Sequence, residues 1–144
     1  MRLLPLTATA ALLLTLGTST AAAQVTPSDT PRQAVARTYL DALVSHDASA
    51  VPFAPHATRV EMGLQTGFSG PQLSHELNTS VFNLTIQNIR DLTMTEAGDT
   101  VTTHYFLEAG LAGVRMATVE ITEKFVVPDG TIHYIEATLT PVAG

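Results

Sequence analysis

The second half of this chain alternates apolar and polar residues through four consecutive segments, and this pattern limits the possible folds more than any other feature. Alternation with a period of two is typical of half-buried strands. Turn-forming residues separate the segments, and Pro128-Asp129-Gly130 is the strongest hairpin signal among them. A slip in the alternation at Asn88-Ile89 predicts a bulge in the first of these strands. We expect four antiparallel strands over residues 84–94, 100–109, 114–127 and 131–140.

The preceding segment carries the periodicity of an amphipathic helix. Between residues 32 and 46 the apolar residues recur at three- and four-residue spacing. Thr30 is expected to cap this helix, and Pro31 suits its first position. Residues 47–53 are expected to form a short second helical turn.

A short strand and a third helix complete the predicted order. Residues 59–64 alternate as a half-buried strand does. Ser69 and Gln72 have the spacing of a capping box, and the apolar stripe of the helix that follows is Leu73, Leu77 and Val81. Helices gathered on one face of a mostly antiparallel sheet predict an α+β domain.

The N-terminal residues resemble a leader and not a part of the fold. A basic Arg2, a short apolar run and a small-residue end at Ala23 are the marks of a secretory signal peptide over residues 1–23. Residues 24–30 are expected to be a flexible lead-in, and residues 31–144 to be one domain. We therefore expect a secreted or periplasmic protein.

Composition excludes several classes of partner. The chain has no cysteine, so an exported form has no disulfide and no lipid anchor on cysteine. Its formal net charge is −6, and a basic face for nucleic acid cannot be assembled from seven lysines and arginines. None of the five histidines is paired at the spacing of zinc ligands. We expect no cofactor, no metal, no nucleic acid and no membrane anchor.

Several segments together resemble the nuclear transport factor 2-like superfamily, in its polyketide-cyclase (SnoaL)-like and ketosteroid-isomerase-like branch. They are residues 39–47, residues 54–61, Gly67 with Gly70, and the turn at residues 128–132. The resemblance implies a cone, in which a strongly bent sheet wraps over two to three N-terminal helices and leaves a pocket for a small, mostly apolar molecule. It also implies a homodimer through the outer face of the sheet.

Comparison with ketosteroid isomerase implies part of a catalytic set. Tyr39 is similar in place to that family's first-helix tyrosine, and Glu61 lies near the position of its carboxylate base. The family's second acid falls near residues 121–122, where this chain has no carboxylic acid. Glu120 or Glu123 would substitute only after a change of register, and a one-residue slip reverses the face of a strand. The constellation is therefore incomplete.

For the other titratable residues, the sequence does not decide whether the side chain faces the pocket or the outside. Arg59 and Glu61 share a strand face that points either into the pocket or into water. His104 is placed either in the cone, as a donor beside an acid, or on the outer face of the sheet. His75 is either a rim residue or a surface residue, and Glu136 faces either the pocket or an interface. The apolar positions expected to face inward are Val60, Val119, Ile121, Phe125, Ile135 and Leu139.

Three functions fit this pattern. The first is a secreted protein that binds a small apolar molecule. The second is an isomerase, cyclase or hydrolase acting by general acid/base catalysis, with Glu61, Tyr39 and His104 as its catalytic residues. The third is a dimerisation or interaction module. Asn78 and Asn83 match the pattern for N-glycosylation, which matters only if a eukaryotic secretory route makes the protein.

Overall fold

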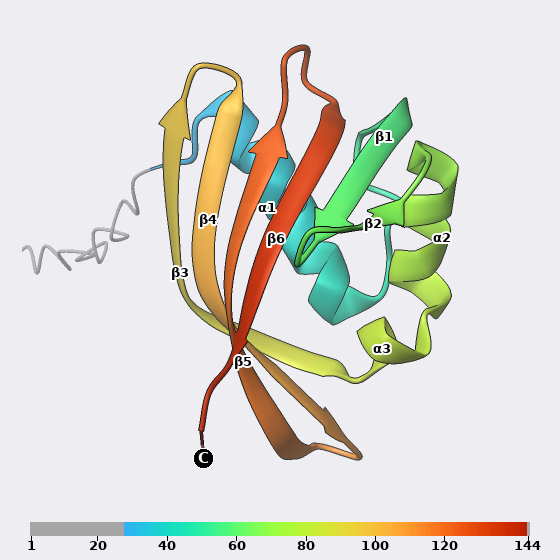
Figure 1. The fold of residues 1–144 in the computed structure, drawn as a ribbon, viewed down its shortest axis with the longest axis vertical. Coiled ribbons are helices and arrows are strands. Elements are labelled where there is room, and N and C mark those ends of the chain that lie inside the picture. Colours follow the sequence, from blue (N-terminus) through green and yellow to red (C-terminus); the bar gives the residue numbers. More distant parts are fainter. Residues whose placement is uncertain (1–27, 144) are drawn as a thin grey trace, which may run out of the picture.

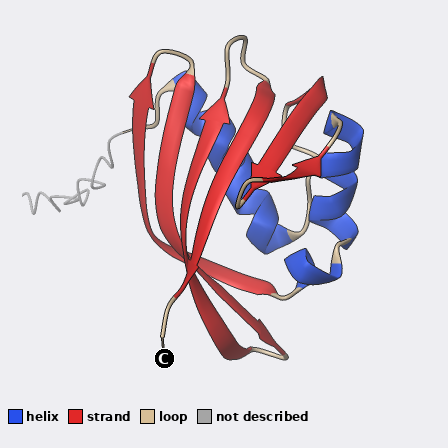
Figure 2. Cartoon of the chain, viewed as in Figure 1, coloured by secondary structure: helices blue, strands red, loops and turns tan. Residues whose placement is uncertain are grey.

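A computed structural model describes residues 28–143, so the predicted signal peptide and most of the lead-in lie outside the described residues. The chain folds into a bent sheet with its helices on one side (Figure 1 and Figure 2). Its elements in order are α1 (Pro31–Ser45), β1 (Phe53–Glu61), β2 (Leu64–Gly67), α2 (Gly70–Thr79), α3 (Val81–Leu84), β3 (Ile86–Ala97), β4 (Thr100–Leu111), β5 (Val114–Val126) and β6 (Ile132–Pro141).

The start of α1 follows from its capping residues, as predicted. The side chain of Thr30 accepts a hydrogen bond from the backbone of Gln33, whose side chain in turn accepts one from the backbone N–H of Thr30. This reciprocal pair satisfies two of the N–H groups that a helix start leaves without a partner. Pro31 at the first position has no N–H to satisfy.

The second helical turn predicted over residues 47–53 is wrong. Asp47 accepts a hydrogen bond from the backbone N–H of Ser49, and Val51 donates to the carbonyl of Ala48, so this segment is a sequence of tight turns. Aspartate favours such local bonds over a helix. The chain then enters β1 at Phe53 instead of near residue 59.

The single predicted strand over residues 59–64 is two strands joined by a hairpin. Met62 and Gly63 both have positive φ values, 51° and 80°. Two consecutive left-handed residues suit the tight turn that matches the twist of paired strands. β2 then pairs antiparallel with β1, and Gly67 lies opposite Arg59.

The third predicted helix is also divided. Ser69 caps α2 through the backbone N–H of Gln72, and Leu73 and Leu77 are fully buried, as the stripe predicts. Val81 is 79% exposed, because α2 ends at Thr79 and a separate turn, α3, begins. The apolar stripe therefore stops one turn earlier than expected.

The six strands form one mixed sheet in the order β2-β1-β6-β5-β4-β3. β1 and β6 are parallel, and every other neighbouring pair is antiparallel. The predicted irregularity in β3 is present as register shifts on either side of residues 88–90. Figure 1 shows the long strands bending around α1, which lies on the concave side. The bent sheet with the helices on its concave side confirms the predicted α+β cone (Figure 1).

The core lies between α1 and the concave face of the sheet. Tyr39, Leu40 and Leu43 of α1 are almost fully buried against strand residues such as Phe125 and Ile135. This core fills one end of the cone and leaves the other end, beside α3, open. None of the helices within residues 28–143 has the length and apolar character needed to cross a bilayer.

Candidate functional site

A cavity of about 670 Å³ occupies the open end of the cone. This volume lies within the range typical of small-molecule sites. Its walls come from α1, α3 and the concave face of β3–β6, and its apolar lining is Leu43, Ile86, Leu107, Ala109, Ala117, Val119, Ile121, Ala137 and Leu139. Polar side chains line it only in part, and several of them belong to one cluster at its inner end, which we call the polar floor: Tyr39, Arg59, Glu61, Glu76, Tyr105 and Glu123.

The most unusual member of the polar floor is Glu123 on β5. It is 3% exposed, and the hydroxyl of Tyr105 on β4 donates to its Oε2 at 2.8 Å. No arginine, lysine or histidine among residues 28–143 forms an ion pair with it. Burial raises the pKa of Glu123 to about 7, although the bond from Tyr105 opposes the shift. Near neutral pH this carboxyl group therefore exists in both its neutral and its ionised form.

Tyr39 on α1 lies next to Glu123 in the polar floor. Its ring makes an edge contact with Phe125, with 5.2 Å between the ring centroids, and is 2% exposed. Burial raises the pKa of its hydroxyl, the Glu123 charge raises it further, and the nearby Arg59 guanidinium lowers it. The phenol is therefore neutral at physiological pH and has a proton to donate.

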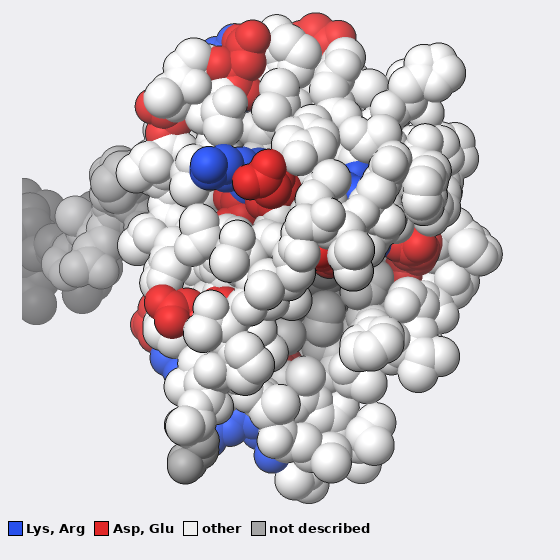
Figure 3. Space-filling model, in the orientation of Figure 1, with Lys and Arg blue, Asp and Glu red and all other residues white. Residues whose placement is uncertain are grey.

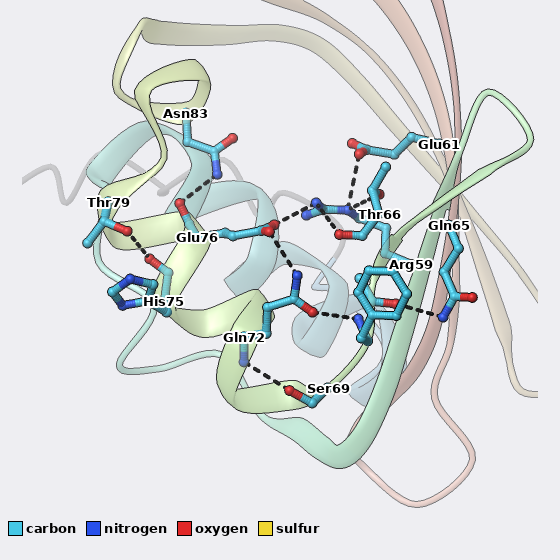
Figure 4. A network of polar contacts seen from close by, with 12 residues as sticks. Arg59, Glu61, Gln65, Thr66, Ser69, Gln72, His75, Glu76, Thr79 and Asn83 are labelled. Atoms are coloured by element: carbon cyan, nitrogen blue, oxygen red, sulfur yellow. Dashed lines mark hydrogen bonds and ion pairs between the residues drawn. The ribbon is translucent and has the colours of Figure 1, made fainter.

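Arg59 on β1 ties the strand to α2. Its Nη2 donates to Glu76 at 2.7 Å, its Nε donates to Thr66 at 2.9 Å, and Glu61 lies 3.3 Å from the same Nε (Figure 4). The Arg59 side chain is 8% exposed. Gly67 makes room for it, because a Cβ at that position would lie 2.9 Å from the Arg59 backbone nitrogen. Two carboxylates thus surround this buried guanidinium.

The entrance of the cavity is apolar. Large apolar side chains are exposed on three segments that border it, the β1–β2 turn, α3 and the β4–β5 hairpin: Met62, Leu64, Val81, Phe82, Leu84, Leu111, Val114 and Met116. Phe82 is 86% exposed and also lines the cavity. Figure 3 shows that the surface over α3, at the lower right, is mostly uncharged, whereas basic atoms lie at the bottom, where the β4–β5 hairpin is.

Five of the predicted site residues meet at this cavity. Tyr39, Arg59 and Glu61 lie in the polar floor, and Val119 and Ile121 lie in the apolar wall. Arg59 and Glu61, whose direction the sequence left open, therefore both face the cavity.

Two predicted positions on the sheet are corrected by the strand faces. His104 does not enter the cavity: its ring nitrogen lies 2.7 Å from Glu120 on the side of the sheet opposite the buried Tyr105. Glu136 is exposed and accepts a hydrogen bond from Tyr134, on the strand face opposite the buried Ile135. Both side chains alternate with residues that face inward, so they face outward.

Two further positions are corrected by packing. Phe125 points inward, but it is fully buried against Tyr39 and belongs to the core beneath the cavity. His75 points away from the Arg59 cluster on the other side of α2 (Figure 4), and it is not part of the cavity lining.

Glu123 and Tyr105 were missed as site residues, although the sequence contained the signal. Val119, Ile121 and Phe125 were expected to face inward, and strict alternation places Glu123 on the same face. No change of register is needed for it to reach the pocket. A carboxylate on an otherwise apolar strand face is therefore the indicator that was available.

The asparagines of both glycosylation patterns make hydrogen bonds to other residues of the protein. Asn78 accepts a hydrogen bond from the backbone N–H of Ala48 at 2.8 Å. Asn83 donates its amide to the carbonyl of Glu76 at 2.9 Å and lines the cavity. Within the part of the chain that the structure describes, no three histidine, aspartate or glutamate side chains gather closely enough to hold a metal ion.

Residues 26–139 match the model of the family described as Domain of unknown function (DUF8021). The chain belongs to this family. No curated protein matches the sequence of this DUF8021 member. Solved structures do match its fold.

An epoxide hydrolase of M. tuberculosis, described as LEH-like, aligns with a TM-score of 0.65 and 15% identity over 79% of this chain and 86% of that chain. An NTF2-like protein of unknown function from Cytophaga hutchinsonii aligns with a TM-score of 0.59 and 12% identity, over 80% and 95%. The epoxide hydrolase/cyclase-like enzyme SalBIII, with a role in pyran ring formation in salinomycin, aligns with a TM-score of 0.59 and 17% identity. The alignment covers 76% of this chain and 90% of that chain. At such identities the likeness concerns the fold, and this fold includes enzymes.

Proposed function

We propose that this protein binds a small, mostly apolar molecule in the cavity, with a polar group of that molecule placed against the polar floor. The observation that carries the proposal is the combination of a 670 Å³ apolar cavity with a buried carboxyl group, Glu123, at its inner end. Apolar walls supply most of the binding free energy, whereas a few polar groups orient the ligand. The predicted export of the protein would place this binding outside the cytoplasm.

A thermal-shift screen with lipids, steroids and polyketide-like compounds tests the proposal. A ligand present at about 100 times its Kd stabilises the folded state by about 2.7 kcal/mol, which raises the melting temperature by several degrees. The matched control is Ala137→Phe, which introduces a ring into the cavity wall. The proposal fails if no compound shifts the melting temperature of the wild type, or if every shift persists in this variant.

A second candidate function is general acid/base catalysis, and the state of Glu123 favours it. A carboxyl group with a pKa of about 7 can both accept and return a proton at neutral pH. Tyr39 has a proton to donate to a developing negative charge, and Glu61 lines the same cavity. These groups suit an isomerase, cyclase or hydrolase that moves a proton on a small apolar substrate.

Proton abstraction can be tested without knowing the substrate. Enolisable ketones of suitable size are incubated with the protein in D₂O, and deuterium at the carbon beside the carbonyl is measured by mass spectrometry. We expect exchange above the protein-free rate, and we expect Glu123→Gln to abolish it. Exchange that is absent, or that is unchanged in Glu123→Gln, would count against the catalytic reading.

A further inference from the structure

The charges that line the cavity do not balance. Within residues 28–143, the cavity lining contains three carboxyl groups, those of Glu61, Glu76 and Glu123, and one basic side chain, that of Arg59. The site therefore carries a net negative charge whether or not Glu123 is ionised. In an apolar cavity such a charge acts more strongly than it does at a surface exposed to water.

The one guanidinium is already committed to two of these carboxylates. Arg59 bonds Glu76 at 2.7 Å and lies 3.3 Å from Glu61. Gln72 donates to the other oxygen of Glu76 at 3.0 Å, so Glu76 is satisfied on both sides. What remains for a ligand is Glu61, which Arg59 contacts only at 3.3 Å, and Glu123, which has the hydroxyl of Tyr105 on Oε2 and no donor from the described residues on Oε1.

The field at Glu123 has a negative sign. Burial is the largest cause of its raised pKa, and the bond from Tyr105 opposes the shift. Of the two nearby charges, that of Glu61 raises the pKa more than that of Arg59 lowers it. The same sign holds at Tyr39, where the charge of Glu123 has a larger effect than that of Arg59. The inner end of the cavity therefore disfavours anions and attracts cations.

We propose that the ligand of this cavity carries one protonated amine on an otherwise apolar skeleton, and that this amine binds at Glu123 beside Tyr39 and Glu61. This inference rests on the proposed function and names the ligand class for the same site. An ammonium group has three N–H donors. Oε1 of Glu123, the carboxylate of Glu61 and the phenol oxygen of Tyr39 are three acceptors that line one cavity.

Such a ligand makes the affinity depend on pH in a defined direction. The groups that face Glu123 are Tyr39 from α1, Arg59 and Glu61 from β1, and Tyr105 from β4, while Ala137 and Leu139 from β6 do not titrate. Burial is the main cause of the raised pKa values of both tyrosines. The pKa of Arg59 is raised as well, because the effects of Tyr39, Glu61 and Glu76 together exceed the lowering by burial. Glu123 is therefore the group that changes charge near pH 7. Amine affinity rises as Glu123 ionises, and binding below pH 7 releases a proton.

Three rigid probes with one hydrocarbon cage test the inference: adamantanamine, adamantanol and adamantane carboxylic acid. Binding is measured by calorimetry at pH 6, 7 and 8, in pairs of buffers with different ionisation enthalpies. We expect the amine to bind about tenfold or more tightly than the alcohol, since a close ion pair shielded from water exceeds a neutral contact by at least this factor. The acid is expected to bind most weakly. At pH 6 the buffer pairs should reveal a proton released with the amine alone.

Variants separate the role of Glu123 from that of the cavity. Glu123→Gln keeps the size and the acceptor of the bond from Tyr105 but removes one charge, so we expect it to lower the amine affinity about tenfold and to change the alcohol affinity much less. Glu136→Gln, on the outer face, is the matched control and should change neither. If Glu123→Gln does not fold, proton release by the wild type decides the question.

The outcomes distinguish the two proposals. Binding of the alcohol or the acid as tightly as the amine, or an amine preference that is undiminished in Glu123→Gln, overturns the inference and leaves the small-molecule function standing. An absence of binding by all three probes, together with a failed thermal-shift screen, overturns both.

Discussion

The buried carboxyl group of Glu123 makes the stability of the fold depend on pH, and replacing it with glutamine should reveal this dependence. The pKa of Glu123 is raised from an ordinary value of 4.5 to about 7, with burial as the largest cause. The folded protein therefore holds this proton more tightly than the unfolded chain does. The contribution of Glu123 to stability is fully present below pH 4.5 and is lost as the pH rises through 7.

The size of the effect follows from the displacement of the pKa. Each pH unit of displacement corresponds to about 1.4 kcal/mol, so the full loss between pH 4.5 and pH 8 is about 3 kcal/mol. Glutamine has no proton to lose and can still accept the hydrogen bond from Tyr105. We therefore expect Glu123→Gln to gain about 3 kcal/mol relative to the wild type between pH 5 and pH 8.

Urea denaturation of both proteins at pH 5, 6, 7 and 8 measures this difference directly. The remaining titrating groups are common to both proteins and cancel in the comparison. Glu136→Gln, which removes an exposed carboxylate from the same sheet, should show a difference that varies little with pH. A constant difference between Glu123→Gln and the wild type across this range would refute the reasoning, because Glu123 would then titrate alike in the folded and unfolded states.

Three further substitutions test other parts of the site. Gly67→Ala should lower the free energy of unfolding by about 1–3 kcal/mol, because a Cβ there lies 2.6 Å from the Leu73 side chain and 2.9 Å from the Arg59 backbone; an unchanged urea midpoint would contradict the close packing. Arg59→Met should cost about 1–3 kcal/mol, since Glu76 loses its 2.7 Å partner; thermal unfolding measures the loss, and no loss would mean that the ion pair adds nothing. Leu139→Trp should leave the melting temperature within a few degrees while abolishing ligand-induced shifts, because the indole enters the cavity; retained shifts would place the ligand elsewhere.

The four long strands β3–β6 could be predicted from the sequence because each alternates along most of its length and is bounded by turn residues. The caps of α1 and α2 were equally readable, since Thr30, Ser69 and Gln72 bond to backbone groups only three or four residues away. The turns over residues 47–53 could not be read in the same way. Aspartate and proline there are compatible with a helix start as well as with a tight turn, and tertiary pairing of β1 decides between them.

The site was harder to predict because alternation states which residues share a face but does not state which face is inside. His104 shares the outer face of β4 with Phe106, where Arg90 lies 4.6 Å above the ring of Phe106. The inner face of β4 carries Tyr105 instead. On β5 the apolar neighbours of Glu123 settle the direction, and alternation alone is then sufficient to place its carboxyl group inside.

The residues of the polar floor come from five elements that lie far apart in the sequence: α1 (Tyr39), β1 (Arg59 and Glu61), α2 (Glu76), β4 (Tyr105) and β5 (Glu123). Each of these elements also contributes other residues to the buried core. A mutation at one floor position can therefore change the chemistry of the site while the backbone that carries it stays in place. A few such substitutions can adapt the same fold to a different small molecule. This is one way in which a single fold comes to bind unrelated ligands.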